Sequence, residues 1–173
     1  MESIKSELIN WDGKSTFILQ DIYNKNCQSP NFIQILTDWS IQDVKLQNAS
    51  TWLLKHYVDK KNTLNRSQTV ALLPALSVAK AWPAQLHLLQ MLPLLPLTEA
   101  DLEILLNPIE RLMQDKVKFV KAWAYYAFAL MTQFVPELRP EVEQIFQIGI
   151  ENESAAIKAR IRRACKDFQL QID

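Results

Sequence analysis

The sequence predicts an all-α fold for this chain of 173 residues. Apolar residues recur at three- and four-residue spacing along almost the whole chain, and strict alternation of apolar and polar residues is rare. Short polar residues stand in front of several of these periodic segments, at the position that caps a helix. A helical unit also recurs along the chain, which indicates a repeat architecture.

The periodic segments predict the helices in order. Ser40, Asn65 and Thr98 each precede one of them, where a side-chain oxygen accepts a hydrogen bond from an unpaired amide of the first turn. Pro74 and Pro108 fall inside helical runs, where a proline removes a backbone hydrogen bond and kinks the helix. The predicted helices span 2–11, 14–26, 30–38, 41–59, 65–79, 82–95, 98–114, 117–134, 137–150 and 154–169.

Four short segments align as an internal repeat. They are "VKLQNAS" from Val44, "AQLHLLQ" from Ala84, "VKAWAYY" from Val120 and "IKARIRR" from Ile157, and they begin 36 to 40 residues apart. Each lies early in a predicted helix, and another predicted helix precedes it. The repeating unit is therefore a helical hairpin with a period near the low end of the HEAT and armadillo range.

Over residues 30–170 the chain resembles the HEAT-like (HEAT/armadillo-type) helical repeat proteins. The resemblance is carried by "VKLQNASTWLLKHY", "VKFVKAWAYYAFALM" and "IKARIRRACKDF", in which an aliphatic–lysine pair is followed by small residues. The segment at Ala84 departs from this pattern, because Gln85 replaces the lysine. The resemblance implies a right-handed superhelical solenoid of about four to five antiparallel hairpins. It implies a single repeat domain over 1–173, with 1–29 as an N-terminal helical cap.

Composition argues against several classes of function. Lysine plus arginine and aspartate plus glutamate both number 19, whereas a dedicated nucleic-acid binder usually has a basic excess. The N-terminus lacks a basic start and a long apolar run, and no apolar stretch is long enough to span a bilayer. Cys27 and Cys165 are in no ligand-like spacing and are interpreted as reduced thiols. We therefore expect a cytoplasmic protein without a membrane segment.

No motif in the sequence indicates catalysis or a cofactor. Phosphate-binding loops and the nucleophile elbow need several glycines close together, and the chain has only Gly13 and Gly149. His56 and His87 have no second ligand type at metal spacing. We expect a protein that is not an enzyme, with no cofactor and no bound metal.

Helix 117–134 is rich in aromatic residues and has two distinct arcs. Trp123 lies at the centre of a broad apolar arc that includes Phe119, and we expect this arc to form core. The opposite arc holds Lys121 and Tyr125, among other polar residues. Tyr125 would there be an exposed aromatic anchor for a partner.

Carrying the repeat register across the chain gives a candidate binding row on the concave surface. The row consists of Lys45, Gln85, Lys121 and Lys158, joined by Tyr125 and Arg162. One interpretation is a solvated helix face, on which lysine is common. The other is a shallow basic groove that binds a protein or an acidic peptide segment.

Two functions remain open at this level. The resemblance favours a non-catalytic protein–protein interaction scaffold or adaptor that binds its partner on the concave face. The alternative is a nucleic-acid-binding module related to the HEAT-like alkylpurine DNA glycosylases. A continuous positive groove with a carboxylate at its floor would favour DNA chemistry, and an apolar or mixed surface would favour a peptide or protein partner.

Overall fold

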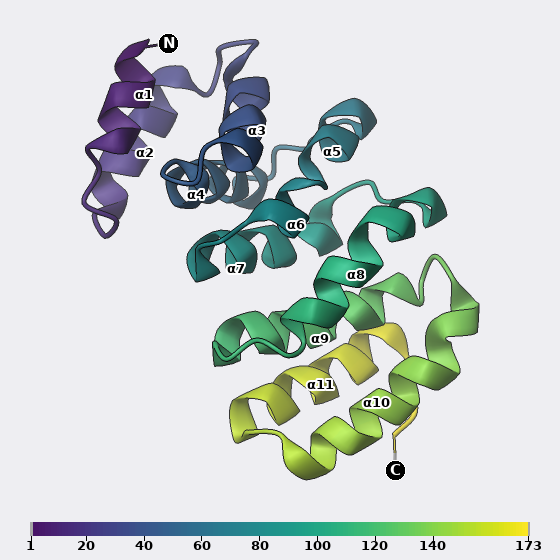
Figure 1. Ribbon diagram of the computed structural model, residues 1–173. Coiled ribbons are helices and arrows are strands. Elements are labelled where there is room, and N and C mark those ends of the chain that lie inside the picture. The colour runs from purple at the N-terminus through teal and green to yellow at the C-terminus, as the bar shows by residue number, and fades with distance from the viewer. Residues whose placement is uncertain (1, 173) are drawn as a thin grey trace. The chain divides into compact units, whose positions relative to one another are not determined.

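In the computed structural model, which describes residues 2–172, every regular element is a helix (Figure 1). This confirms the predicted all-α class. The chain divides into two compact units, one ending at Pro96 and the other beginning at Leu97. The single repeat domain and its superhelical arrangement stay predictions.

The first unit contains seven α-helices and one short 3₁₀ helix among the described residues. They are α1 (Glu2–Ile9), α2 (Thr16–Asn26), α3 (Phe32–Gln42), α4 (Gln47–Asp59), α5 (Arg66–Leu72), α6 (Ala75–Val78), α7 (Trp82–Met91) and η1 (Leu92–Leu94). Helix α4 packs against α3 and α7. Leu36, Leu53 and Leu89, one from each of these three helices, are fully buried and form the centre of this core.

In its described residues, the second unit contains four longer helices joined by short turns. Its elements are η2 (Glu99–Asp101), α8 (Leu102–Leu112), α9 (Lys118–Met131), η3 (Pro136–Leu138), α10 (Arg139–Asn152) and α11 (Ala155–Phe168). Helix α9 is central, because it packs against α8, α10 and α11. Its buried alanines, such as Ala124 and Ala127, let neighbouring helices approach closely. A helix with neighbours on several sides is apolar around most of its circumference, as the sequence of α9 is.

Two of the three predicted helix caps are present. The Asn65 side chain accepts a hydrogen bond from the Gln68 amide at 2.9 Å, and the Gln68 side chain returns one to the Asn65 amide. Asp101 accepts a hydrogen bond from the Thr98 amide at 2.8 Å, which closes a similar capping box. The prediction for Ser40 was wrong: it lies inside α3, and its hydroxyl donates to the Leu36 carbonyl at 2.7 Å.

The two interior prolines affect their helices differently. Predicted helix 65–79 is interrupted at Pro74, which separates α5 from α6. Pro108 lies inside α8 and is buried. Predicted helix 41–59 begins later than expected, at Gln47, because α3 continues to Gln42 and Asp43 then adopts an extended conformation.

Candidate functional site

Two residues of the predicted row, Lys121 and Tyr125, share a carboxylate partner that the sequence analysis did not include. Both lie on α9, one turn apart, and Glu153 directly follows α10. The Lys121 ammonium lies 2.5 Å from Glu153 Oε1. Tyr125 donates its hydroxyl to the same oxygen at 3.4 Å. Lys121 is half-buried, and its charge is neutralised inside the second unit.

Tyr125 is buried, so the prediction of an exposed aromatic anchor was wrong. The residue is only 5% exposed, and its ring centroid lies 5.6 Å from that of Phe146 on α10. Tyr125 also covers Gly149, where an added Cβ would lie 3.4 Å from Tyr125 Cε1. Burial, with the nearby Glu153 carboxylate, raises the pKa of Tyr125 to about 12. The error arose because α10 covers the arc of α9 that looks polar in the sequence.

The two row residues on α11 differ from each other. Lys158 is half-buried, and its ammonium donates to the Glu151 carbonyl at 3.1 Å. Arg162 is exposed. In the second unit, the row therefore contains a paired lysine, a buried tyrosine, a lysine bound to a backbone carbonyl and one exposed arginine.

The remaining row residues, Lys45 and Gln85, belong to the first unit. Lys45 is exposed but lies in the turn before α4, and Val44, the expected apolar anchor, is 60% exposed. The repeat register was therefore wrong at this segment. Gln85 is buried on α7 and donates its amide to the Ala79 carbonyl at 3.1 Å. Its placement on a binding surface was wrong, because the side chain serves the core of its own unit.

Trp123 is half-buried, where the sequence predicted a core position. The Arg160 guanidinium lies 4.0 Å from the centroid of the Trp123 ring, in a cation–π contact between α11 and α9. Tyr126 packs beside the indole at 5.2 Å between ring centroids. Phe119, assigned to the same apolar arc, is 64% exposed. The arc was misplaced because the directions from which α8, α10 and α11 pack on α9 decide which of its sides are covered.

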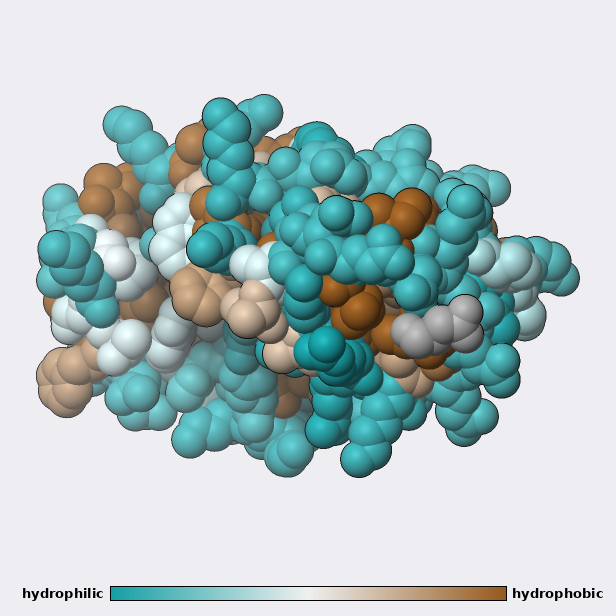
Figure 2. Space-filling model, turned by 90° about the horizontal axis from the view of Figure 1, so that it is seen from below, coloured by the Kyte–Doolittle hydropathy of each residue, from teal (hydrophilic) through white to brown (hydrophobic). Residues whose placement is uncertain are grey.

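Exposed apolar side chains elsewhere are scattered over both units. Figure 2 shows polar side chains over most of the face that it draws, with hydrophobic side chains in separate patches among them. The organised apolar surface lies instead in two grooves of the second unit. One is lined by residues of η2 and α8 and of the connection between α9 and α10, and the other by residues of α9, α10 and the C-terminal end of α8.

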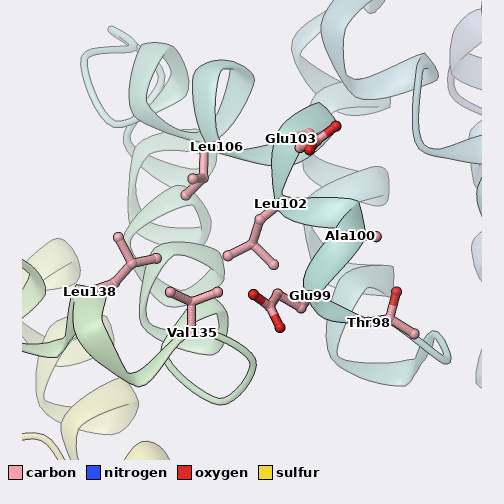
Figure 3. A pocket seen from close by; sticks show the side chains of 8 residues that line it. All are labelled: Thr98, Glu99, Ala100, Leu102, Glu103, Leu106, Val135 and Leu138. Carbon is pink, nitrogen blue, oxygen red and sulfur yellow. The ribbon is translucent and has the colours of Figure 1, made fainter.

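The first of these, the Leu106 groove, has a volume of about 650 Å³. Figure 3 shows Leu102 and Leu106 from the side of α8, and Val135 and Leu138 from the connection between α9 and α10. The Glu99 carboxylate lies beside Leu102 and Val135 in the same view. The full lining is Thr98, Glu99, Ala100, Leu102, Glu103, Leu106, Val135 and Leu138.

The second, the Ile145 groove, has a volume of about 380 Å³. Its floor includes Phe128 and the ring of Tyr125 on α9, and Ile148 at one side is 54% exposed. Glu110 and Glu141 line it from α8 and α10. The full lining is Glu110, Met113, Gln114, Tyr125, Phe128, Glu141, Ile145 and Ile148.

The two grooves are lined by successive turns of α8 on one side and by the chain that leads through η3 into α10 on the other. From Leu106 to Glu110 on α8 is about one helical turn, and from Leu138 to Glu141 at the start of α10 is again about one turn. Each lining set repeats at three- or four-residue spacing, so it forms one stripe along its helix. Helices α8 and α10 both pack on α9. We call the combined surface the α8–α10 trough, defined by the lining residues of the Leu106 and Ile145 grooves.

The trough is acidic at its edges. Four glutamates line it, all exposed, and none of them takes part in a salt bridge with another described residue: Glu99, Glu103, Glu110 and Glu141. No lysine or arginine is among the described residues that line either groove. The trough therefore combines an apolar floor with a negative rim.

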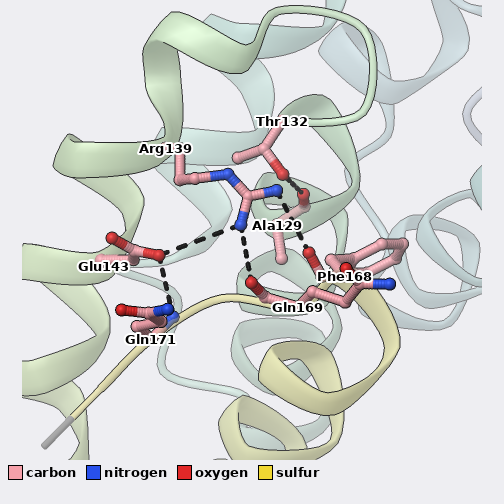
Figure 4. Close-up of polar contacts among 7 residues, drawn as sticks. All are labelled: Ala129, Thr132, Arg139, Glu143, Phe168, Gln169 and Gln171. Atoms are coloured by element: carbon pink, nitrogen blue, oxygen red, sulfur yellow. Dashed lines mark hydrogen bonds and ion pairs between the residues drawn. The ribbon is translucent and has the colours of Figure 1, made fainter.

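Arg139, at the first residue of α10, is engaged by the C-terminal segment. Its guanidinium donates to the Gln169 carbonyl at 2.7 Å and to the Phe168 carbonyl at 3.3 Å (Figure 4). Glu143 lies 3.9 Å from the same guanidinium and accepts a hydrogen bond from the Gln171 amide. These bonds hold residues 168–171 against α10. They also pair the Arg139 charge with groups inside the second unit.

The first unit contains a different kind of cavity, of about 230 Å³ and lined mainly by polar residues. The His56 ring stacks on the Trp52 ring with centroids 4.8 Å apart, and Lys55 pairs with Asp59 at 2.5 Å. His87 and Gln90 of α7 face these residues of α4. The lining is Trp52, Lys55, His56, Asp59, His87 and Gln90.

The protonation of His87 follows from its neighbours. Thr51 donates its hydroxyl proton to the Gln47 carbonyl at 2.7 Å, so it accepts a hydrogen bond from His87 Nδ1, which lies 3.1 Å away. Burial, together with the positive charge of Lys55, lowers the pKa of His87 to about 4. His87 is therefore neutral near pH 7, with its proton on Nδ1.

The described residues offer neither a metal site nor a membrane-spanning helix. Over residues 2–172, no cluster of three or more histidine, cysteine, aspartate or glutamate side chains is arranged to hold a metal ion. None of the described helices has the length and apolar character needed to cross a membrane. No protein-family model matches the chain, and neither a curated protein nor a solved structure matches it either. The resemblance to HEAT-like repeats stays a prediction.

Sequence reasoning missed the α8–α10 trough. Its clearest sequence signal is the segment "TEADLE", whose acidic residues are ordinary at a helix start because of the helix dipole. In the structure, Asp101 of this segment is a buried cap, whereas Glu99 and Glu103 are exposed at the trough. Three- and four-residue spacing alone does not distinguish a stripe that is covered from one that is left open.

Proposed function

We propose that this chain is a non-catalytic protein-binding module, a scaffold or adaptor that holds a segment of a partner protein. The α8–α10 trough is the observation that carries the proposal. Its half-buried leucine, valine and isoleucine side chains remain in contact with water, and covering them with a partner is favourable. The proposed binding surface is thus the trough, in place of the basic row inferred from the sequence.

The charges around the trough support a protein partner over a nucleic acid. A phosphate backbone is held mainly by lysine and arginine, and its binding is opposed by carboxylates. The trough presents glutamates, and Lys121, the most central lysine of the predicted row, is already paired with Glu153. An apolar floor with a charged rim is the arrangement that peptide-binding grooves use.

The proposal is tested by comparing what three forms of the chain retain from a native lysate. The parent chain is compared with Leu106→Gln/Ile145→Gln, which makes the trough floor polar, and with Phe119→Gln. Phe119 is exposed on α9 outside the trough, so the last variant is a matched control. Circular dichroism melting first establishes that all three are folded.

We expect a defined set of proteins to be retained by the parent and by Phe119→Gln and lost with the double variant. Nuclease treatment should leave this set unchanged. An identical set for all three forms would place binding elsewhere on the chain. Loss of the retained material after nuclease treatment would favour the nucleic-acid alternative.

A further inference from the structure

We infer that the α8–α10 trough binds an amphipathic helix of a partner protein whose flanking positions are lysine and arginine. The inference rests on the proposed protein-binding function and specifies the chemistry of the partner. Three features of the trough carry it: the length of the trough, the apolar side chains of its floor and the negative charge of its rim.

The lining residues set the length of the trough. Its stripe on α8 and the turn before it runs from Glu99 to Gln114, which corresponds to about 22–25 Å at the rise of a helix. That length matches a partner helix of about 15 residues. A helix presents side chains at three- and four-residue spacing, and these interdigitate with stripes of the same spacing on α8 and α10.

The floor selects an apolar stripe on the partner. Leu106 and Leu138 are half-buried in the Leu106 groove, and Ile145 is half-buried and Ile148 exposed in the Ile145 groove. An amphipathic helix laid along the trough buries its leucine-type positions at i, i+3, i+4 and i+7 against these residues. A fully polar segment would bring no apolar side chains to cover these residues.

The rim selects the charge of the partner. The two rim glutamates of the Leu106 groove and the two of the Ile145 groove are exposed, and they are free of salt bridges to other described residues. Lysine and arginine at the flanks of the bound helix would lie opposite these carboxylates, whereas glutamate or aspartate there would be repelled. The acidic partner expected from the sequence is therefore replaced by a basic one.

The test uses fluorescein-labelled peptides of about 18 residues that contain only leucine and one charged residue. In the first peptide, leucines follow helical spacing and all other positions are lysine. The second has the same composition with leucines spread around the helix. The third keeps the leucine positions and replaces every lysine with glutamate. Binding to the full chain is followed by fluorescence polarisation at several salt concentrations.

We expect the first peptide to bind most tightly and to weaken as salt rises, because the rim charges are exposed and screened. Glu99→Gln/Glu110→Gln removes one rim charge from each groove and should weaken this binding about 3- to 10-fold at low salt. Glu137→Gln/Glu151→Gln makes the same change in net charge at exposed positions outside the trough and should leave binding unchanged. Leu106→Gln/Ile145→Gln should weaken binding at every salt concentration.

The outcomes separate this inference from the proposed function. Equal or tighter binding of the glutamate peptide, lost with Leu106→Gln/Ile145→Gln, would overturn the basic partner while leaving a peptide-binding trough. Equal binding of the two lysine peptides, or equal effects of the two glutamate-pair variants, would reduce the interaction to general charge attraction and overturn the inference. If no peptide responds to Leu106→Gln/Ile145→Gln, both the inference and the trough as binding surface are wrong.

Discussion

Lys121 and Tyr125 acquire their roles from one carboxylate that is far away in the sequence. Glu153 lies 28 residues beyond Tyr125, yet it accepts the tyrosine hydroxyl and pairs with the lysine ammonium. Both side chains therefore connect α9 to the end of α10. Residues that look like a binding surface on an isolated helix contribute instead to the internal contacts of the second unit.

This arrangement predicts that two lysines of the proposed row respond differently to charge reversal. Lys121→Glu places a second carboxylate beside Glu153 in a half-buried position and should reduce the free energy of unfolding by about 1–3 kcal/mol. Lys45→Glu alters an exposed turn and should change it by less than about 0.5 kcal/mol. Urea unfolding of the two variants measures the difference. Equal stability of both would contradict the pairing with Glu153.

A second prediction concerns the contact between Trp123 and Arg160. The guanidinium covers the indole ring at 4.0 Å, and this pair connects α9 to α11. A double-mutant cycle with Trp123→Ala and Arg160→Ala should give a coupling energy of about 0.5–1 kcal/mol, the range of an exposed cation–π contact. Trp123→Ala alone should cost less than the roughly 3–5 kcal/mol of a fully buried tryptophan. A coupling energy near zero would mean that the two side chains act independently.

At the scale of elements, α4 and α7 bury a titratable group between them. His87 donates from Nδ1 to Thr51 on α4, and its surroundings include the charged pair Lys55 and Asp59 and the ring of His56. Protonating His87 would place a positive charge in a site where burial and Lys55 both oppose it. The interface between α4 and α7 is therefore expected to weaken in acid.

The sign of this effect follows from the two pKa values of His87. The pKa of His87 is 6.5 in the unfolded chain and about 4 in the folded chain. Between these two pH values only the unfolded state binds the proton. The contribution of neutral His87 to the free energy of unfolding is complete above pH 6.5, and it is lost as the pH falls toward 4. Thermal melts of the parent and of His87→Gln between pH 7 and pH 4 should show a steeper loss for the parent, and parallel curves would contradict the assignment.

Helix α9 shows why neighbouring elements decide the faces of a helix. It contacts α8, α10 and α11, and the residues that stay half-buried or exposed, such as Trp123 and Phe119, lie where these neighbours leave gaps. The trough arises in the same way, because α8 and α10 both pack on α9. Its acidic rim comes from Glu141 on α10 and from three glutamates of α8 and the turn before it, which lie 31 to 42 residues earlier in the chain.

For the whole molecule, the division after Pro96 leads to a test of independent folding. Each unit has its own buried core, with Leu36 and Leu53 in the first and Val120 and Phe146 in the second. We expect a fragment of residues 97–173 to retain helical circular dichroism and to unfold cooperatively on heating. A single repeat domain with shared stability would instead leave this fragment largely unfolded.

The sequence by itself determined the helical class, the positions of most helices and the caps at Asn65 and Thr98. These depend on side-chain spacing and on hydrogen bonds between residues three apart, which local sequence contains. The tertiary structure alone decided that Tyr125 and Gln85 are buried, that Lys121 is paired and that an acidic trough lies open along α8 and α10. Burial and charge pairing depend on which distant segments lie against a helix, and the spacing of residues along that helix does not contain this information.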